Sequence, residues 1–479
     1  MMPALNPEQE QPMSVEFIGF ITNNNSSETI VRTGPVLDRH YIETVAKAHE
    51  SAGFDRALLA FHSTSPDCLQ VGQHVLGVTD RLNVLIAQRP GFTAPTLIAR
   101  QLATVDQLSG GRVALHVITG GNATELKQDG NTIDDKDERY ARTDEFLDVV
   151  RAEWTSEKPF SYDGKYYQVQ NGFSQVKPYR SEGIPIFVGG ASDAAIEVAG
   201  KHADTFALWG ESYAQVRDVT SRVRAAAAKH GRAAPRFSLS VRPILADTEE
   251  KAWAKAEEIL ARATALQDKT GYRKPADGHA TAGARRLLTL AEQGTRIDKR
   301  LWTEIAKLTG ANSNTTALVG TPAQVAEVFG DYYDLGISHA RIGLMLESQG
   351  DFASAVEEYE ACLAIAKRLA AANRDNALVQ RNLALVYGKL AAAHHHLGKS
   401  GQAITELQRG RKIIAALIEV APGIERLTGD LELFEHRISA LEGRGQRDGD
   451  SPSGTAFSMT LSTAMTSAAE ADQVQEPAD

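Results

Sequence analysis

The chain has 479 residues, of which 42% are hydrophobic and 23% are charged. Because domains average roughly 150 residues, this length predicts two or three domains, or one large barrel with an appendage. The formal net charge of −10 argues against a protein that binds nucleic acid or an anionic membrane over its whole surface. The two cysteines, Cys68 and Cys362, form no disulfide framework, which fits a reducing cytoplasm. No run of 18 apolar residues occurs, so we expect no membrane span.

Short apolar segments alternate with helical segments from residue 15 to residue 344. The helical segments carry apolar residues three and four positions apart, and the one that begins at Pro95 ends at Gly110. An Asp-Gly pair between aromatic residues predicts a β-hairpin over 159–175. The predicted strands are residues 15–22, 56–62, 83–88, 112–118, 184–190, 205–210, 237–245 and 339–344. The predicted helices include 38–54, 66–79, 138–155, 192–203, 213–230, 249–267 and 322–335.

Eight β-helix units within about 330 residues predict an α/β fold, a (β/α)8 TIM barrel with insertions. Such units need parallel strands joined by right-handed crossovers. An open, doubly wound sheet is the alternative that the same pattern allows. Residues 268–313 form a long, less periodic excursion within this region.

The region beyond residue 345 has helical signals only, and it repeats. Gly350 recurs 48 residues later as Gly398, and apolar residues at helical spacing follow both. This is typical of a helix-turn-helix repeat. We therefore expect a disordered N-terminus at 1–13, a barrel at 14–344, an all-α tail of helical repeats at 345–443, and a disordered C-terminus at 444–479. We also expect the first tail helices to cover the outer face of the last strand.

The sharpest chemical feature is the sequence GGASDAA at 189–195. Two glycines follow a predicted strand, and Ser192 begins the next helix. Backbone N–H groups and the helix N-terminus can bind a phosphate here without a cationic side chain. A tight turn in which Ser192 is only an N-cap is the other interpretation. The sequence TGG at 119–121 is a second such turn.

Polar residues follow several other predicted strands, and in a parallel barrel these positions meet at one end. They include His62, Arg89 and Arg242. Cys68 falls early in a helix, where either a reactive or a buried, inert thiol is possible. The adjacent histidines at 394–396 point in different directions on one helix, so we predict no metal site.

Several segments together resemble one enzyme family. These are RPGFTAPTLIARQLATVDQLSGGRVALHVITGGN, DERYARTDEFLDVVRAEW, IPIFVGGASDAAIEVAGKHAD, ALWGE and TALVGTPAQVAEVFGDYYDLGI. In this order they are similar to the flavin-dependent monooxygenases of the bacterial luciferase-like superfamily, and the nearest branch resembles alkanesulfonate monooxygenase. The resemblance covers about 14–344. The tail resembles tetratricopeptide repeats of the long type, which usually bind proteins.

The resemblance implies a two-component, cytoplasmic enzyme that is a homo-oligomer. Reduced FMN would come from a separate NAD(P)H-dependent flavin reductase, and with O2 it would oxygenate a small organosulfur substrate such as an alkanesulfonate. The implied cofactor-binding residues are Thr119, Gly120, Tyr140, Gly190, Ala191 and Ser192. The catalytic candidates are His62, Arg89 and Arg242.

The chain also departs from the sulfonate enzymes of this family. Ser65 stands where they have an active-site cysteine, Ser240 and Arg242 replace an Arg and a His, and Ala311 falls near a substrate-binding Arg. The family's last barrel segment is replaced by the tail. Two alternatives therefore stay open. One is a catalytically impaired barrel that binds a protein partner through its repeats. The other is a flavin or deazaflavin oxidoreductase that transfers hydride.

Overall fold

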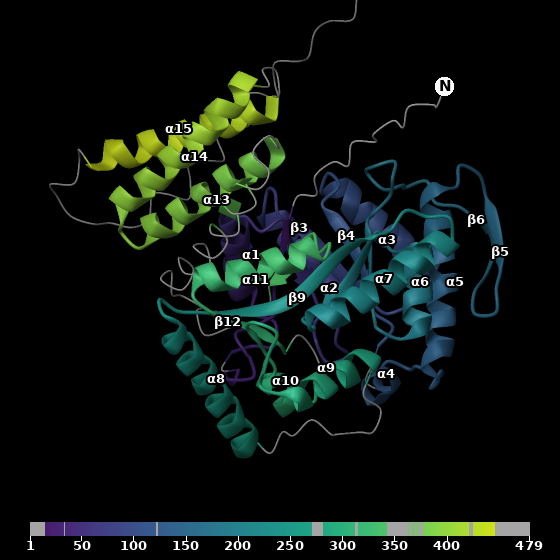
Figure 1. Ribbon diagram of the computed structural model, residues 1–479. Helices are drawn as coiled ribbons and strands as arrows, with labels where there is room; N and C mark the ends of the chain where they lie inside the picture. The colour runs from purple at the N-terminus through teal and green to yellow at the C-terminus, as the bar shows by residue number, and fades with distance from the viewer. Residues whose placement is uncertain are drawn as a thin grey trace, which may run out of the picture.

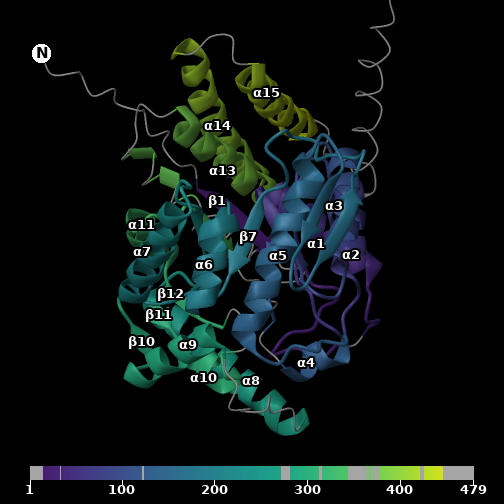
Figure 2. The same cartoon turned by 90° about the vertical axis from the view of Figure 1, so that its right-hand side faces the viewer.

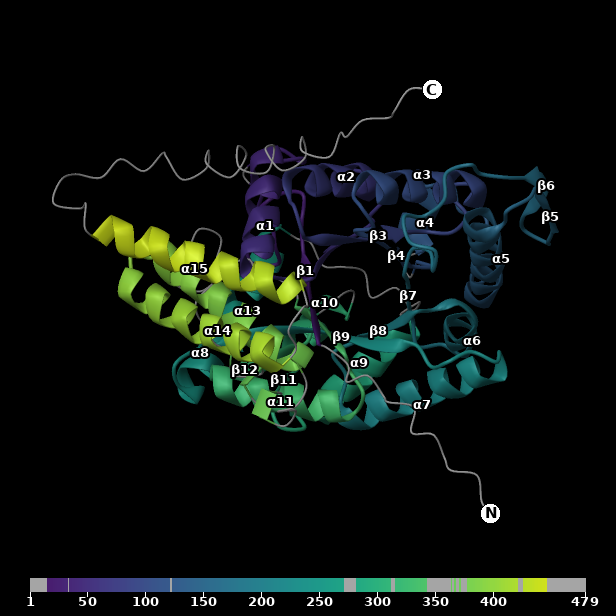
Figure 3. The same ribbon diagram turned by 90° about the horizontal axis from the view of Figure 1, so that it is seen from above.

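The computed structural model describes residues 15–342 except 33, 121–122, 271–280 and 312–314, and residues 377–420 and 425–445. It also describes Leu363, 366–367 and 370–371. Eight parallel strands form a closed barrel, and helices surround it (Figure 3). The predicted α/β barrel is therefore confirmed, and the open sheet is excluded. None of the described helices is both long and apolar enough to cross a membrane.

The barrel strands occupy the eight segments that the apolar pattern predicts. They are β1 (Glu16–Phe20), β2 (Arg56–Leu59), β3 (Asn83–Gln88), β4 (Val113–Val117), β7 (Ile186–Gly189), β8 (Thr205–Trp209), β9 (Arg236–Leu245) and β13 (His339–Ile342). The ring closes where β13 pairs in parallel with β1 on one side and with β9 on the other. Both faces of these strands are covered, which explains their continuous apolar runs.

Helices follow most barrel strands and pack on the outside of the ring. They are α1 (Arg39–Ala52), α2 (Cys68–Val78), α3 (Pro95–Leu108), α5 (Lys136–Thr155), α6 (Asp193–His202), α7 (Tyr213–Lys229) and α11 (Pro322–Asp334). Close approach depends on small residues: a Cβ on Gly200 of α6 would lie 2.6 Å from the backbone of Ala226 on α7. Trp154 of α5 fixes this helix to α3 through a 2.9 Å hydrogen bond to the carbonyl of Ala99.

Insertions extend the barrel at two places. The predicted hairpin is β5 (Phe160–Asp163) paired with β6 (Gln168–Gly172). The second half of β9 extends past the ring and pairs in parallel with β12 (Ala317–Gly320). Two further strands pair antiparallel beyond β12, first β11 (Leu301–Trp302) and then β10 (Arg296–Ile297). The helices α4 (Ala123–Gln128), α8 (Glu249–Thr270), α9 (Ala282–Gln293) and α10 (Glu304–Thr309) lie near the carboxyl end of the barrel (Figure 1). The sequence did not predict β10, β11, β12, α4, α9 or α10, because most of them are too short for a periodic signal.

The C-terminal region contains α13 (Ala377–His396), α14 (Ser400–Val420) and α15 (Glu425–Gly445). Gly398 has a φ of 72° at the turn between α13 and α14, which agrees with the glycine of the predicted repeat. Lys389 of α13 donates a hydrogen bond to the carbonyl of Gly53, just after α1. Figures 1 and 2 show this region at the end of the molecule opposite α4, α9 and α10, so it leaves the carboxyl end of the barrel uncovered.

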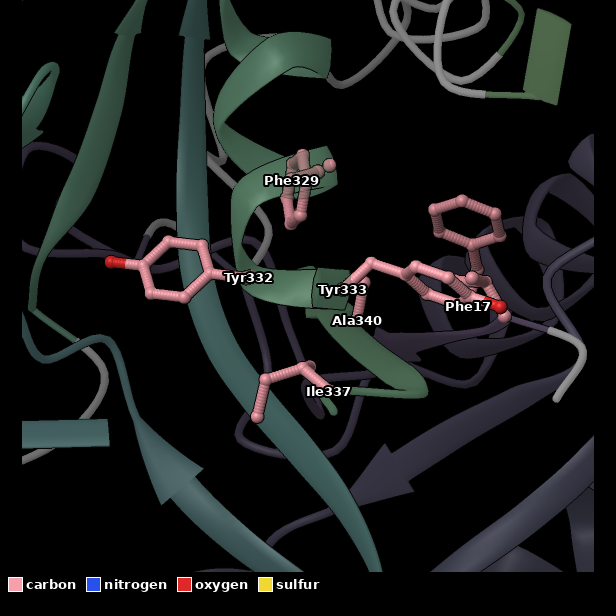
Figure 4. Close-up of a pocket in the computed structure, with 8 residues that line it drawn as sticks. Phe17, Phe329, Tyr332, Tyr333, Ile337 and Ala340 are labelled. Atoms are coloured by element: carbon pink, nitrogen blue, oxygen red, sulfur yellow. The ribbon is translucent and has the colours of Figure 1, made fainter. Parts of the chain in front are cut away.

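An apolar gap of about 20 Å³ lies on the outer face of the barrel where β1 and β13 meet α11. Figure 4 shows Phe329 and Tyr333 of α11 beside Phe17 of β1 and Ala340 of β13. In a (β/α)8 barrel the helix after the eighth strand packs here. The residues that we expect to cover this strand, beginning at 345, lie outside the described part of the chain, so that expectation stays a prediction.

A buried ion cluster stabilises the closure at the amino end of the barrel. The carboxylate of Glu16 lies 3.6 Å from Arg56 of β2, 3.3 Å from Arg236 of β9 and 3.3 Å from His339 of β13. Burial by itself would raise the pKa of Glu16, but His339 and the two arginines outweigh it and lower this pKa to about 2. One carboxylate thus joins four strands of the ring.

We predict that Glu16→Gln lowers the midpoint temperature of thermal unfolding by several degrees at pH 7, because removing one partner of a buried pair costs about 3 kcal/mol. The stabilisation is present above the ordinary pKa of 4.5 and is lost as pH falls toward about 2. The difference between wild type and variant should therefore narrow over that range. The control is Glu257→Gln on the exposed face of α8, which should change nothing. A difference that is independent of pH would contradict this role.

Candidate functional site

The turn between β7 and α6 forms a cradle of backbone N–H groups. Gly190 has a φ of 137°, which an L side chain rarely adopts. Ser192 is the N-cap of α6, and its Oγ accepts a hydrogen bond of 3.3 Å from the N–H of Ala195. Within the described residues, the N–H groups of Ala191, Ser192 and Asp193 donate to no other group. Ser192 is thus the N-cap of α6, and the turn still leaves donors available to an anion.

Tyr140 of α5 lies directly against this turn. Its hydroxyl donates to the carbonyl of Gly189 at 3.4 Å, and a Cβ on Gly190 would come within 2.3 Å of the same oxygen. Burial raises the pKa of Tyr140 to about 12, although a hydrogen bond with Thr119 acts in the opposite direction. The phenol is therefore protonated and can donate. Gly120, beside Thr119, has a φ of 86° and packs on Leu126.

The predicted cofactor residues therefore meet in one place, although three different elements supply them. They are Thr119, Gly120, Tyr140, Gly190, Ala191 and Ser192, from the ends of β4 and β7 and from α5. A Cβ at Gly190 would collide with the Tyr140 hydroxyl and with Ala195, and the donors at this turn are neutral amides and hydroxyls. This donor set fits a phosphate group such as that of FMN.

Two of the predicted catalytic residues share one carboxylate. Arg89 is buried, and its Nη2 lies 2.8 Å from Oε1 of Glu125 on α4. It also donates to the hydroxyl of Ser63 at 3.2 Å. His62 approaches the same oxygen of Glu125 at 3.5 Å, with 59% of its side chain exposed. Arg89 is thus neutralised and holds α4 in place, whereas His62 is accessible.

Arg242, the third predicted catalytic residue, lies on β9 and forms an ion pair with Glu28 from the loop after β1. No hydrogen bond or ion pair of the described residues joins Arg242 to His62 or Arg89. The hydroxyl of Ser240, two residues earlier on β9, is buried and has no partner among the described residues. The three predicted residues therefore form two separate groups, each with its own carboxylate.

A cavity of about 210 Å³ opens at the carboxyl ends of β1 and β2. Its lining includes Phe20, Ala60, His62, Ser65 and Cys68. The thiol of Cys68 donates to the carbonyl of Ala87 at 2.9 Å, and burial raises its pKa to about 12. The cysteine is therefore a protonated, buried thiol and not a nucleophile, whereas His62 and Ser65 can contact a small molecule in the cavity.

The sequence analysis missed two polar residues inside the barrel, His116 on β4 and Arg341 on β13. Both are buried, at 6% and 8% exposure. His116 stands at an inward position of a strand that is otherwise apolar, and Arg341 at an inward position of β13, two residues after His339. That pattern, a charged or imidazole side chain within a buried strand, was the signal that could have found them.

One group of possible metal ligands occurs in the described part of the chain, formed by Asp144, Asp148 and His202. The ammonium of Lys201 bonds to both carboxylates at 2.9 Å, and Tyr162 donates to Asp148 at 3.2 Å. A lysine already supplies the positive charge that these acids need. This cluster stabilises the contact of α5 with α6 and is no part of the candidate site.

We predict that Gly190→Ala destabilises the protein by more than Gly110→Ala. Both glycines have positive φ, which costs alanine about 1–2 kcal/mol, but only a Cβ at position 190 meets other atoms, the Tyr140 hydroxyl among them. Adding Tyr140→Phe to Gly190→Ala should recover part of the difference. Thermal unfolding of wild type, Gly190→Ala, Tyr140→Phe and the double variant measures this coupling, and Gly110→Ala is the control. Equal losses at positions 190 and 110 would show that the turn is not packed as described.

Several solved structures have the same fold as this chain. An EDTA monooxygenase from Chelativorans sp. BNC1 is 20% identical, with a TM-score of 0.58, over 74% of this chain and 94% of that one. A riboflavin lyase with modified FMN and riboflavin is 18% identical, with a TM-score of 0.57, over 71% and 89%. A long-chain alkane monooxygenase is 20% identical, with a TM-score of 0.56, over 71% and 89%.

At these identities the solved structures support the fold alone. The family itself follows from the sequence, because the luciferase-like monooxygenase family matches residues 15–339, more than half of the chain. That range begins one residue before β1 and ends at the first residue of β13. It therefore includes the whole barrel up to its last strand, together with the turn at Gly190. The chain belongs to the luciferase-like monooxygenase family.

Proposed function

We propose that this chain is a flavin-dependent monooxygenase of the two-component kind. A separate NAD(P)H-dependent reductase would supply reduced FMN, and a small organosulfur compound would be the substrate. The observation that carries the proposal is the turn at 189–192 in a barrel of this family: an anion cradle at the carboxyl end of the strands. When bound there, reduced FMN would supply two electrons, so that one atom of O2 enters the substrate and the other leaves as water.

The residues of the turn have separate parts in this proposal. Gly190 leaves room for the Tyr140 hydroxyl and allows the backbone of the turn its positive φ, and the N–H groups of 191–193 donate to the oxygens of the phosphate. The positive end of α6 adds to the attraction without a cation. Tyr140 and Thr119 fix the turn from the side and line the path of the flavin ring. A preformed cradle of this kind binds without a large rearrangement.

Other elements would exclude water from the reacting atoms. A Cβ on Gly283, near the start of α9, would lie 3.2 Å from the Trp209 ring, so α9 covers the end of β8. Arg286 of α9 fixes this cover through a two-point ion pair with Glu211, at 2.9–3.2 Å. Burial raises the pKa of Glu211, whereas Arg286 lowers it. Exclusion of water protects a reduced flavin and its oxygenation from side reactions.

We predict that Ser192→Asp weakens the binding of reduced FMN at least tenfold, or about 1.4 kcal/mol, because a carboxylate would lie beside the phosphate. Aspartate is as good an N-cap as serine, so α6 and the unfolding temperature should be unchanged. Anaerobic titration with reduced FMN, followed by flavin absorbance, measures the affinity. The matched control is Thr321→Asp at the N-cap of α11, which should bind like wild type. Wild-type affinity in Ser192→Asp would place the phosphate elsewhere.

We further predict that the purified chain oxidises no NAD(P)H by itself. With a flavin reductase and O2, it should release sulfite or another oxygenated product from at least one member of a panel of small sulfonates and sulfones. Product release is measured together with O2 consumption, because consumption without product reports only free reduced flavin. Direct oxidation of NAD(P)H would contradict the two-component assignment. Substrate turnover without O2 would favour the hydride-transfer alternative.

A further inference from the structure

Arg341 lies inside the barrel, and none of the described residues supplies it with a counter-ion. Arg341 is in register with Ile18 of β1 and with Ser240 of β9, close to the carboxyl end of β13. Its neighbour Ala340 faces the apolar gap beneath α11, so the alternation of the strand turns Arg341 inward. Across the described part of the chain, the Arg341 guanidinium has no hydrogen bond and no ion pair. Arg89 and Arg242 differ in this respect, since each has a carboxylate partner.

The groups near Arg341 are neutral hydrogen-bonding groups. Burial, and then the charge of Arg341, lower the pKa of His116 to about 3, so this imidazole is neutral at pH 7. Burial also lowers the pKa of Arg341, to about 10, which leaves the guanidinium charged. In the described structure, the Nδ1 of His116 and the hydroxyl of Ser240 have no hydrogen-bond partner. The Arg341 cation thus lies in the barrel interior near two polar groups that have no hydrogen-bond partner among the described residues.

The side chains in the same layer of the barrel as His116 are mostly small. The apolar layer beneath it consists of Ile18, Leu58, Leu85, Ala114 and Phe187. Two residues further along the same strands, where side chains again face inward, stand Phe20, Ala60, Ala87, His116 and Gly189. Three of these five are alanine or glycine, so their side chains fill little of the space. Phe20 and Ala60 also line the cavity of about 210 Å³, which opens this layer to the carboxyl end.

This layer also adjoins the proposed flavin site. A Cβ on Gly189 would lie 3.7 Å from Cε1 of His116, and the phosphate turn begins at the next residue, Gly190. His116 interacts with the charge of Arg341 on the opposite side of the ring. An anion bound by Arg341 would therefore lie in the barrel interior, below the end at which we place the flavin.

We propose that Arg341, together with His116 and Ser240, binds the oxyanion group of the substrate, a carboxylate or a sulfonate. The substrate would enter with its negative end first and leave its other end toward the flavin. A guanidinium binds such groups with two parallel hydrogen bonds, and a buried cation without a partner is unfavourable until an anion arrives. This inference rests on the proposed function for the identity of the ligand. It assigns the anion to Arg341, not to Arg89 or Arg242.

The first test is the stability of the full chain in buffer without oxyanions. If Arg341 has no internal partner, Arg341→Met should keep or raise the unfolding temperature, because an apolar side chain replaces an unpaired charge. The control is Arg112→Met. Arg112 donates hydrogen bonds to the carbonyls of Leu76, Thr79 and Leu82, so its replacement should lower the unfolding temperature. A lower unfolding temperature in Arg341→Met would mean that a carboxylate of this chain already pairs with Arg341, and would overturn the proposal.

The second test titrates wild type with sodium methanesulfonate and with sodium acetate, at an ionic strength held constant with sodium chloride. We expect a saturable increase of the unfolding temperature with at least one of them. Arg341→Met should lower the affinity for that anion at least tenfold. Arg341→Lys should lower the affinity less, since lysine keeps the charge but loses the two-point contact. The difference between the two salts identifies the head group. Equal affinities in wild type and Arg341→Met would overturn the proposal.

A third arm separates this inference from the proposed function. Arg341→Met should bind reduced FMN as wild type does in the anaerobic titration. If the affinity of Arg341→Met for reduced FMN is tenfold lower than that of wild type, the anion held by Arg341 is the flavin phosphate, and the substrate assignment is wrong. If wild type binds no FMN but still binds the oxyanion through Arg341, the anion site stands and the proposed function fails.

Discussion

The closure of the barrel between β1 and β13 is the constraint on which the site depends. Both strands are short, and their parallel pairing brings the last strand of the barrel against the first. Glu16 stabilises this junction because its charge is shared with groups from β2, β9 and β13. Once the ring is closed, all eight carboxyl ends face one direction. The turn at 189–192, the cavity at the carboxyl ends of β1 and β2, and the loop helices therefore lie at the same end of the barrel.

The same closure also decides which polar groups stay unpaired. Groups that reach the loops, such as Arg89 and Arg242, find carboxylates on neighbouring segments, because loops are exposed and variable in path. Arg341 and His116 are held inside the ring, where Ser240 adjoins Arg341 and Ala87 adjoins His116. For Arg89 and Arg242 the carboxylate comes from a loop helix or from a loop, Glu125 on α4 and Glu28 after β1. This contrast separates structural ion pairs from the group we assign to the substrate.

The helical region bears on function through its position. It contacts the barrel at the end of α1, where Lys389 bonds to the carbonyl of Gly53, far from α4, α9 and α10 (Figures 1 and 2). A partner bound to α13–α15 would leave the carboxyl end of the barrel open. Within the region, Arg381 of α13 and Asp430 of α15 form a two-point ion pair, so these helices pack as one unit. The helical region and the proposed flavin site thus lie at opposite ends of the described structure.

The sequence by itself determined the eight strands, their parallel order and the glycine turn before α6, because each depends on short-range spacing: apolar runs, helical periodicity, and Gly-Gly before an N-cap. It did not determine β12 or α9, whose existence depends on pairing with the far half of β9 and on packing over Trp209. Nor did it distinguish Arg341 from Arg89 or Arg242. Arg89 follows a predicted strand, and Arg242 and Arg341 lie within predicted strands, but the presence of a counter-ion is a property of segments distant in sequence. Only the tertiary structure, by bringing Glu125 and Glu28 to two arginines and none of the described carboxylates to the third, decided which charge is available.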